Sequence, residues 1–183
     1  LNTLETIVNA LGAQKGIFAL KGKYKNATRA LKENVGKLEN LEIFELKDFY
    51  PAGDEQVLVY EVTGRIVPEG GIPLLVGCVV INVETLLNIA NAIKGIPVTH
   101  SYVTVTGMVK RPATFCVPIG VSFKSLIDMA GGATVSDYVV IDGGPMMGKV
   151  TSNLSQPVTK TTKGIIVLSS SHPLVLKKDI DLG

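Results

Sequence analysis

The first half of the chain alternates between the hydrophobic spacing of helices and that of strands. Apolar residues recur at i, i+3, i+4 and i+7 over residues 4–11, which predicts a helix with one buried face that ends at Gly12. A short apolar run at 17–20 predicts a buried strand, and helical spacing returns over 27–38. Residues 41–46 alternate apolar side chains with Glu, the period of a strand. Helix, strand, helix, strand is the order of a layered α/β domain.

Glycine and proline interrupt this pattern between residues 48 and 96, and shorter elements follow one another. In order, we predict a loop at 48–53, a helix at 55–63 ended by Gly64, an irregular stretch at 65–73, a third strand at 78–81 and a helix at 86–93 closed by Gly95.

The second half has a different pattern of predicted elements, because short strands outnumber helices. Residues 102–106 and 114–117 read as a hairpin around a turn at 107–112. Ser122 is a good N-cap for a helix that ends at the glycine pair 131–132, and a strand follows at 138–141. Hairpin, helix and strand in this order indicate a small α+β unit such as a β-grasp.

The domain boundary should fall between residues 96 and 101. We therefore expect an α/β domain over 1–97 and a β-grasp domain over 98–150. A return segment over 151–183 should contain a last strand at 164–168 and end in a linker from 177 onwards.

Composition excludes several classes of protein. Hydrophobic residues make up 46% of the chain, enough for a core, while the net charge of +2 is too small to indicate nucleic-acid binding. The apolar runs are too short to cross a bilayer, so we expect no membrane insertion. Cys78 and Cys116 sit among apolar neighbours outside any C-x-x-C motif, which predicts buried, reduced thiols and favours the cytoplasm. His100 and His172 are expected at the surface, and the sequence offers neither metal-ligand spacing nor a nucleophile–base pair.

Three segments nevertheless carry candidate chemistry. The first is Tyr-Pro-Ala-Gly-Asp-Glu at 50–55, which brings two acids to the start of a helix. Acids in this position complement the helix dipole and can serve simply as caps. They can equally accept hydrogen bonds from a ribose or ribityl hydroxyl, as acidic residues do in nucleotide sites. The pattern leaves both interpretations open.

The second segment is Ile-Asn-Val-Glu-Thr at 81–85, where a predicted strand meets a helix. Backbone N–H groups at such a helix start can bind phosphate, with Asn82 and Thr85 as added donors, although Asn82 can also act as an N-cap. The third is Asp-Gly-Gly-Pro-Met-Met-Gly at 142–148, for which a tight loop is favoured over a ligand site. Its two methionines could pack on a neighbouring domain or ring system.

Taken together, the motifs resemble a family of flavoproteins. The chain is similar to the C subunit of the Rnf electron-transport complex and to the cobalamin reductase of propanediol utilisation, and more distantly to the NADH-binding subunit of complex I. The segments that carry the resemblance are Tyr-Pro-Ala-Gly-Asp-Glu at 50–55, Val-Thr-Gly-Arg at 62–65, Asn-Val-Glu-Thr at 82–85, Val-Thr-Gly-Met-Val-Lys-Arg-Pro at 105–112, Gly-Gly-Pro-Met-Met-Gly at 143–148 and Pro-Val-Thr-Lys-Thr-Thr at 157–162.

The resemblance implies a partial Rossmann-like FMN-binding domain of three layers, followed by a soluble-ligand-binding (SLBB) β-grasp domain. It also implies that residues in the first two segments contact FMN or NADH. Carried over by position, these residues are Tyr50, Gly53, Asp54, Glu55, Asn82 and Thr85. In the family, a glycine-rich phosphate loop precedes the region where this chain begins, and a cysteine-rich segment that holds 4Fe-4S clusters follows the region where it ends.

These implications define the functional hypothesis. The chain is expected to be a fragment of a subunit that passes electrons from NADH through FMN and iron–sulfur clusters. The acceptor would be a corrinoid or an Rnf-type membrane complex. The partners would be other electron-transfer subunits or a corrinoid-dependent enzyme system. The location would be the cytoplasm, a bacterial microcompartment or the cytoplasmic face of a membrane complex. Alone, the fragment is expected neither to bind FMN tightly nor to catalyse a reaction. The alternative is a non-catalytic module that binds a ligand or docks a subunit through the β-grasp domain.

Overall fold

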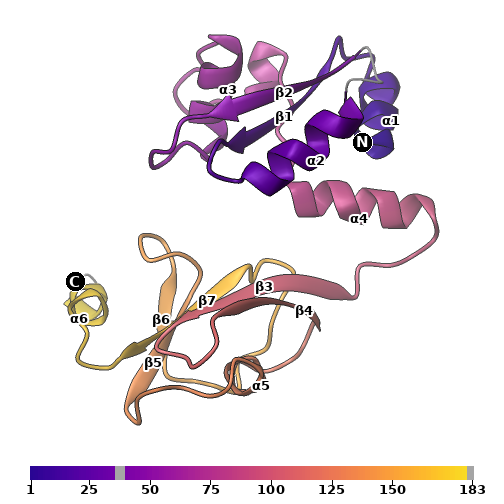
Figure 1. Cartoon of the computed structure of the whole chain (residues 1–183). Coiled ribbons are helices and arrows are strands. Elements are labelled where there is room, and N and C mark those ends of the chain that lie inside the picture. The colour runs from indigo at the N-terminus through magenta and orange to yellow at the C-terminus, as the bar shows by residue number, and fades with distance from the viewer. Residues whose placement is uncertain (36–39, 181–183) are drawn as a thin grey trace. The chain divides into compact units, whose positions relative to one another are not determined.

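The computed structural model describes residues 1–35 and 40–180, with the side chains of 178–180 excepted. The chain forms two compact units, Leu1–Ile96 and Pro97–Gly183. Figure 1 shows a small sheet with helices in the first unit and a larger sheet in the second. Each unit has its own hydrophobic core, so each can be described by itself.

The first unit begins with the four elements that the hydrophobic pattern predicts: α1 (Asn2–Leu11), β1 (Gly16–Lys21), α2 (Lys25–Val35) and β2 (Leu41–Leu46). β1 and β2 pair in parallel, in register from Gly16 opposite Leu41 to Lys21 opposite Leu46. Gly12 ends α1 with a φ of 61°, as predicted. The core of this unit contains Val8, Val35 and Leu41. Part of the helix expected over 27–38 lies outside the described residues.

Three helical elements follow in the first unit: α3 (Glu55–Thr63), the 3-10 helix η1 (Pro73–Val76) and α4 (Val83–Ile93). Helix α4 is apolar, yet none of its residues is buried. The strand expected at 78–81 is absent: these residues join no sheet, and Val79 is 56% exposed. An apolar run becomes a strand only when a neighbouring strand completes its hydrogen bonds, and within the described residues β1 and β2 pair with each other alone.

The second unit is built on a five-stranded sheet in the order β4-β3-β7-β5-β6. Its elements are β3 (His100–Gly107), β4 (Ala113–Pro118), α5 (Phe123–Met129), β5 (Tyr138–Asp142), β6 (Lys149–Thr151), β7 (Gly164–Ser169) and α6 (Pro173–Ile180). The predicted hairpin is confirmed as the antiparallel pair β3–β4. The last strand, β7, runs parallel to β3 and antiparallel to β5 in the middle of the sheet.

The core of the second unit lies between the sheet and α5. Phe123, Leu126 and Ile127 of α5 are fully buried against inward-facing strand residues such as Val103 and Val167. Ser122 caps α5, as predicted, by accepting a hydrogen bond from the backbone N–H of Ser125. The short strand β6 was not predicted, because three residues are too few for an alternating pattern to be recognised.

Two further expectations differ from the structure. Helix α6 continues to Ile180, into the segment interpreted as the start of a linker. Cys116 is exposed and Cys78 only partly buried, so the prediction of buried thiols was wrong. Cys116 faces Tyr102 across the hairpin on the outward side of the sheet, whereas its neighbour Val117 points inward. Local hydrophobicity indicates a strand but does not fix which face an individual side chain joins. No helix among the described residues is long and apolar enough to cross a membrane.

Candidate functional site

The first candidate segment begins at the carboxyl ends of the two parallel strands. β1 and β2 end together at Lys21 and Leu46, which lie opposite each other. The chain leaves β2 at this edge and enters the loop 47–54, which leads into α3 (Figure 1). In open α/β sheets, ligands bind outside the carboxyl ends of the strands. The fold therefore places the acidic segment 50–55 where such a site would be expected.

Two lysines from the end of β1 hold the start of this loop. Lys21 donates a hydrogen bond from Nζ to the carbonyl oxygen of Phe49 at 3.0 Å and lies 3.2 Å from a carboxylate oxygen of Asp48. Lys23 lies 2.9 Å from the same carboxylate. The hydrogen bonds from Lys23 and Lys21 lower the pKa of Asp48, and the bond to Asp48 raises the pKa of Lys23. Sequence reasoning missed this cluster, since its members are separated along the chain and meet only because the two strands are parallel.

The loop itself is tightly folded around a buried alanine. Ala52 is completely buried, and its backbone N–H donates to the carbonyl oxygen of Phe49 at 3.3 Å. The side chain of Tyr50, by contrast, is 69% exposed. Gly53 borders open space, with no atom within 4 Å of where a Cβ would stand. The loop thus presents an aromatic ring and an open backbone position to the solvent.

Asp54 and Glu55 have different roles at the start of α3. Asp54 is the N-cap: its Oδ1 accepts hydrogen bonds from the backbone N–H groups of Gln56 at 3.0 Å and Val57 at 3.3 Å. Glu55 is exposed in the first turn of the helix. The capping interpretation therefore holds for Asp54. The carboxylate of Glu55 is accessible to a ligand from the solvent.

The second candidate segment lies at the start of a different helix. Asn82 caps α4, because its Oδ1 accepts a hydrogen bond from the backbone N–H of Glu84 at 2.9 Å. Its side-chain amide nitrogen remains a possible donor, and Thr85 is exposed about one turn further on. Tyr50, Gly53, Asp54 and Glu55 thus share one loop and helix start, whereas Asn82 and Thr85 belong to another helix start.

Two hydrogen bonds organise the chain between these helix starts. Arg65 follows α3 and donates from Nη1 to the carbonyl oxygen of Val76 at 2.8 Å. Gln56, in the first turn of α3, reaches the carbonyl oxygen of Gly71 at 3.5 Å. Both bonds tie α3 to the irregular segment that leads through η1 towards α4, and neither was predicted from the sequence.

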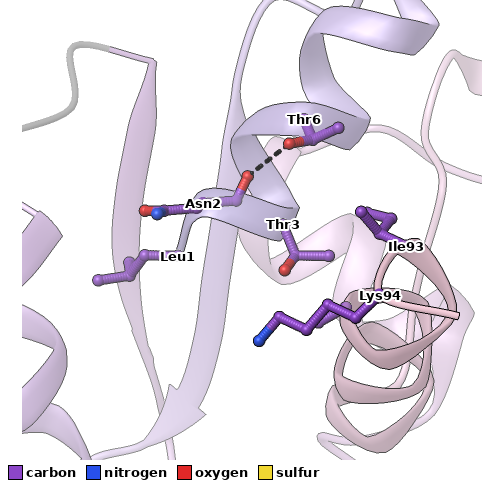
Figure 2. Close-up of a pocket in the computed structure, with 7 residues that line it drawn as sticks. Leu1, Asn2, Thr3, Thr6, Ile93 and Lys94 are labelled. Carbon is purple, nitrogen blue, oxygen red and sulfur yellow. Dashed lines mark hydrogen bonds between the residues drawn. The ribbon is translucent and has the colours of Figure 1, made fainter. Parts of the chain in front are cut away.

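An open cavity of about 490 Å³ in the first unit lies elsewhere. Figure 2 shows its walls, formed by the start of α1 and the end of α4, with the Thr6 hydroxyl donating to the carbonyl oxygen of Asn2 at 2.9 Å. The lining residues are Leu1, Asn2, Thr3, Thr6, Ala90, Ile93 and Lys94. None of the candidate residues is among them, since Asn82 and Thr85 lie at the opposite end of α4. Among the described residues, no group of His, Cys, Asp and Glu side chains could hold a metal ion.

The third candidate segment is a tight loop between β5 and β6 in the second unit. The backbone N–H of Gly148 donates to the carbonyl oxygen of Gly144 at 2.8 Å, and a Cβ on Gly148 would lie 2.6 Å from Cγ2 of Ile141. Met146 and Met147 project from the loop and are 68% and 88% exposed. The geometry is that of a compact turn with two apolar side chains at its tip, so it agrees with the favoured interpretation.

Comparison with known proteins defines the class of the chain. Residues 1–91 match the family described as the Nuo51 FMN-binding domain, and residues 102–150 match the SLBB domain. The chain therefore belongs to the proteins that join these two domains, and the fold class predicted from the sequence is confirmed.

Within that class, the chain is related to cobalamin reductases and to the C subunits of ion-translocating ferredoxin:NAD(+) oxidoreductase complexes, here called the Rnf-type relatives. It is 46% identical to cobalamin reductase PduS of Salmonella typhimurium over 93% of its length, and 47% identical to that of Citrobacter freundii. It is 39% identical to the C subunit of the Na(+)-translocating ferredoxin:NAD(+) oxidoreductase complex of Acetobacterium woodii over 91% of its length. The predicted family resemblance is confirmed. The chain spans about 38% of the length of each of these relatives.

A solved structure supports the same fold. One chain of an NAD+-reducing [NiFe]-hydrogenase in the air-oxidized state superposes with a TM-score of 0.71 and 24% sequence identity. The match covers 93% of this chain and 35% of the hydrogenase chain. At this identity the likeness concerns the fold alone.

Proposed function

We propose that this chain is part of a subunit that transfers electrons from NADH through FMN. The observation that carries the proposal is the 46% identity to cobalamin reductase PduS across both units, together with the match of residues 1–91 to an FMN-binding domain. In this proposal residues 1–97 form the nucleotide-binding domain and 98–150 the SLBB domain. Residues 151–183 return through β7 to the sheet of the second unit and then lead towards the iron–sulfur part of the longer protein.

The residues at the carboxyl ends of β1 and β2 fit part of a nucleotide. Tyr50 offers an exposed ring face, and Glu55 offers a carboxylate that can accept hydrogen bonds from ribose or ribityl hydroxyls. Gly53 leaves room for close approach to the backbone. When bound, FMN would supply the redox chemistry. In this proposal the protein orients the flavin and the nicotinamide, and Asp54 contributes by fixing the start of α3.

The second helix start fits the anionic part of a nucleotide. The first turn of α4 presents backbone N–H groups at the positive end of the helix dipole, and Asn82 and Thr85 add side-chain donors. We assign the electron acceptor as a corrinoid, because identity is higher to the cobalamin reductases than to the Rnf-type relatives. The partners would be other electron-transfer components in the cytoplasm or a microcompartment.

A second candidate function is a docking module, and the exposed tip of the β5–β6 loop favours it. Met146 and Met147 are adaptable apolar side chains on a compact loop of the SLBB unit. In this alternative the second unit holds a ligand or a neighbouring subunit and the chain carries out no electron transfer.

The visible absorption spectrum of the complete gene product distinguishes the two functions. The protein is purified without oxygen and measured before and after addition of NADH, and any released flavin is identified by chromatography. Flavin and iron–sulfur absorbance that NADH bleaches is the expected result. A colourless protein, also after reconstitution with FMN, iron and sulfide, would refute the electron-transfer function and favour the docking module.

A further inference from the structure

Lys21 connects the sheet to the loop that carries Tyr50 and Glu55. Its backbone is fixed in two ways: it pairs with Leu46 in the parallel register, and its carbonyl oxygen accepts a hydrogen bond from the backbone N–H of Tyr24 at 3.0 Å. Its ammonium group then reaches the carbonyl oxygen of Phe49 at 3.0 Å. The sheet holds the backbone of Lys21, and the ammonium group of Lys21 holds the loop, so the position of the loop depends on that of the sheet.

The bond from Lys21 acts directly on the backbone of the loop. The carbonyl group of Phe49 also accepts the N–H of Ala52, which closes the turn immediately before Gly53. Phe49 is therefore the point where the turn meets the end of β1. Loss of the Lys21 contact would free the turn at its attachment to the sheet, although the cap at Asp54 would still hold the start of α3.

The environment of Lys21 differs from that of the other lysines at the sheet ends. Its side chain is 25% exposed, compared with 51% for Lys23 and 50% for Lys15. The Lys21 side chain is therefore more ordered by its surroundings than the other two, although its partner Phe49 is itself exposed. Lys15 joins the same two strands at their opposite ends, through an ion pair with Glu42 at 2.9 Å. Substitution of Lys15 is therefore a matched control for substitution of Lys21, because each removes a lysine contact between the two strands or their ends.

We infer that Lys21 is a positioning residue, which sets the loop 47–54 against the end of the sheet so that Tyr50 and Glu55 face the bound nucleotide. Only the orientation of Tyr50 and Glu55 towards a nucleotide rests on the proposed function. The attachment of the loop to the sheet by Lys21 can be measured without any cofactor. Lys21 itself need not touch the nucleotide, since its ammonium group is occupied by Phe49 and Asp48.

The test compares Lys21→Met, Lys21→Arg and Lys15→Met in the complete gene product, with circular dichroism to verify folding. Amide hydrogen exchange of Ala52 and Asp54 reports the loop, since both N–H groups donate within it. In Lys21→Met we expect exchange at these amides to be about tenfold faster, as loss of one hydrogen bond from a charged donor implies. Lys15→Met should leave exchange in the loop as in the wild type, and Lys21→Arg should restore it because a guanidinium group can make the same bonds.

The kinetic part of the test uses NADH oxidation by the flavin-loaded protein. Lys21→Met should raise the KM for NADH about tenfold with kcat changed less than about twofold, and Lys21→Arg should recover most of the KM. Unchanged exchange in Lys21→Met would overturn the positioning role. Faster exchange with an unchanged KM and unchanged FMN affinity would overturn its connection to the nucleotide. If the wild type holds no flavin, the proposed function fails, and the exchange measurement still decides whether Lys21 holds the loop.

Discussion

Asp54 caps helix α3 by accepting, at 3.0 Å, a hydrogen bond from the backbone N–H of Gln56. Its carboxylate therefore has a structural role irrespective of any ligand. Asp54→Ala should lower the free energy of unfolding by about 1 kcal/mol, because the first-turn N–H groups lose their acceptor. Urea denaturation followed by circular dichroism measures this change.

Asp54→Ser separates capping from ligand binding. Serine is as good an N-cap as aspartate but carries no charge, so we expect stability within about 0.5 kcal/mol of the wild type. If Asp54 acts only as a cap, Asp54→Ser will keep the FMN affinity of the wild type, and any loss of affinity in Asp54→Ala will accompany its loss of stability. A large loss of FMN affinity in Asp54→Ser, at wild-type stability, would show instead that the carboxylate contacts the nucleotide.

The bounds of α3 could be predicted from the sequence, whereas α4 begins three residues before the predicted start and α6 was not predicted. The helix expected over 55–63 has these bounds in the structure, because an acidic cap precedes it and Gly64, with a φ of 71°, ends it. Both signals act within a few residues of the chain, so they can be recognised without knowledge of the tertiary structure. Ser122 fixed the start of α5 in the same way, while that helix ends at Met129, shortly before the glycine pair 131–132.

Features that depend on distant neighbours could not be predicted. Residues 78–81 have the composition of a strand but find no strand to pair with among the described residues. Cys116 lies in a strand, as expected, but on its outward face. At the candidate site, motifs identified the residues 50–55 and 82–85, whereas the attachment of the first loop through Lys21 appears only once β1 and β2 lie side by side.

Gly107 is required for a close approach between two strands of the second unit. Its φ is 88°, and a Cβ would clash with the carbonyl oxygen of Val167 in β7. Gly132 has the same φ of 88°, but no atom lies within 4 Å of its Cβ position. Both Gly→Ala variants carry the cost of a left-handed backbone, about 1–2 kcal/mol, and only Gly107→Ala adds a steric clash with backbone atoms.

We therefore expect Gly107→Ala to destabilise the second unit by about 2 kcal/mol or more beyond Gly132→Ala. Amide exchange of β3 and β7 in the two variants, at equal pH and temperature, gives the comparison. Equal losses of protection would mean that β3 and β7 separate easily at Gly107, contrary to the geometry.

Asp142 should make stability depend on pH. Partial burial raises the pKa of its carboxyl group above the ordinary value of 3.8, so the folded protein holds this proton more tightly than the unfolded chain. Below pH 3.8 the carboxyl group is protonated in both the folded and the unfolded state, so its burial does not lower the free energy of unfolding through a charge. As the pH rises through that value towards the folded pKa, the cost of a buried charge appears and stability falls.

Asp142→Asn removes this cost while its side-chain oxygen can still accept the hydrogen bond that Gln156 donates at 3.3 Å. The Tm of the variant should exceed that of the wild type at pH 7, and the difference should vanish below pH 3.8. Asp128→Asn, at an exposed ion pair with Lys124, is the control and should not raise the Tm. A difference of the same size at both pH values would exclude ionisation of Asp142 as its cause.

Arg65 should protect the thiol of Cys78. Its Nη1 donates to the carbonyl oxygen of Val76 at 2.8 Å and lies 3.9 Å from Sγ of Cys78, so it closes the turn after η1 over the cysteine. In Arg65→Met the turn loses this bond, and the thiol should become more accessible. The alkylation rate of the thiol in the two proteins, measured under the same conditions, gives the comparison.

Cys116 provides an internal reference, because it is exposed and belongs to the second unit, whereas Arg65 belongs to the first. Mass spectrometry of the alkylated protein should show Cys116 reacting faster than Cys78 in the wild type. In Arg65→Met the rate at Cys78 should rise about fivefold relative to Cys116, as expected for one lost hydrogen bond. Arg65→Lys should give an intermediate ratio, since an ammonium group can still bond Val76 but cannot span the turn as a guanidinium group does. An unchanged ratio in Arg65→Met would show that the turn keeps its shape without the arginine, and that η1 and Gly77 are sufficient to hold it.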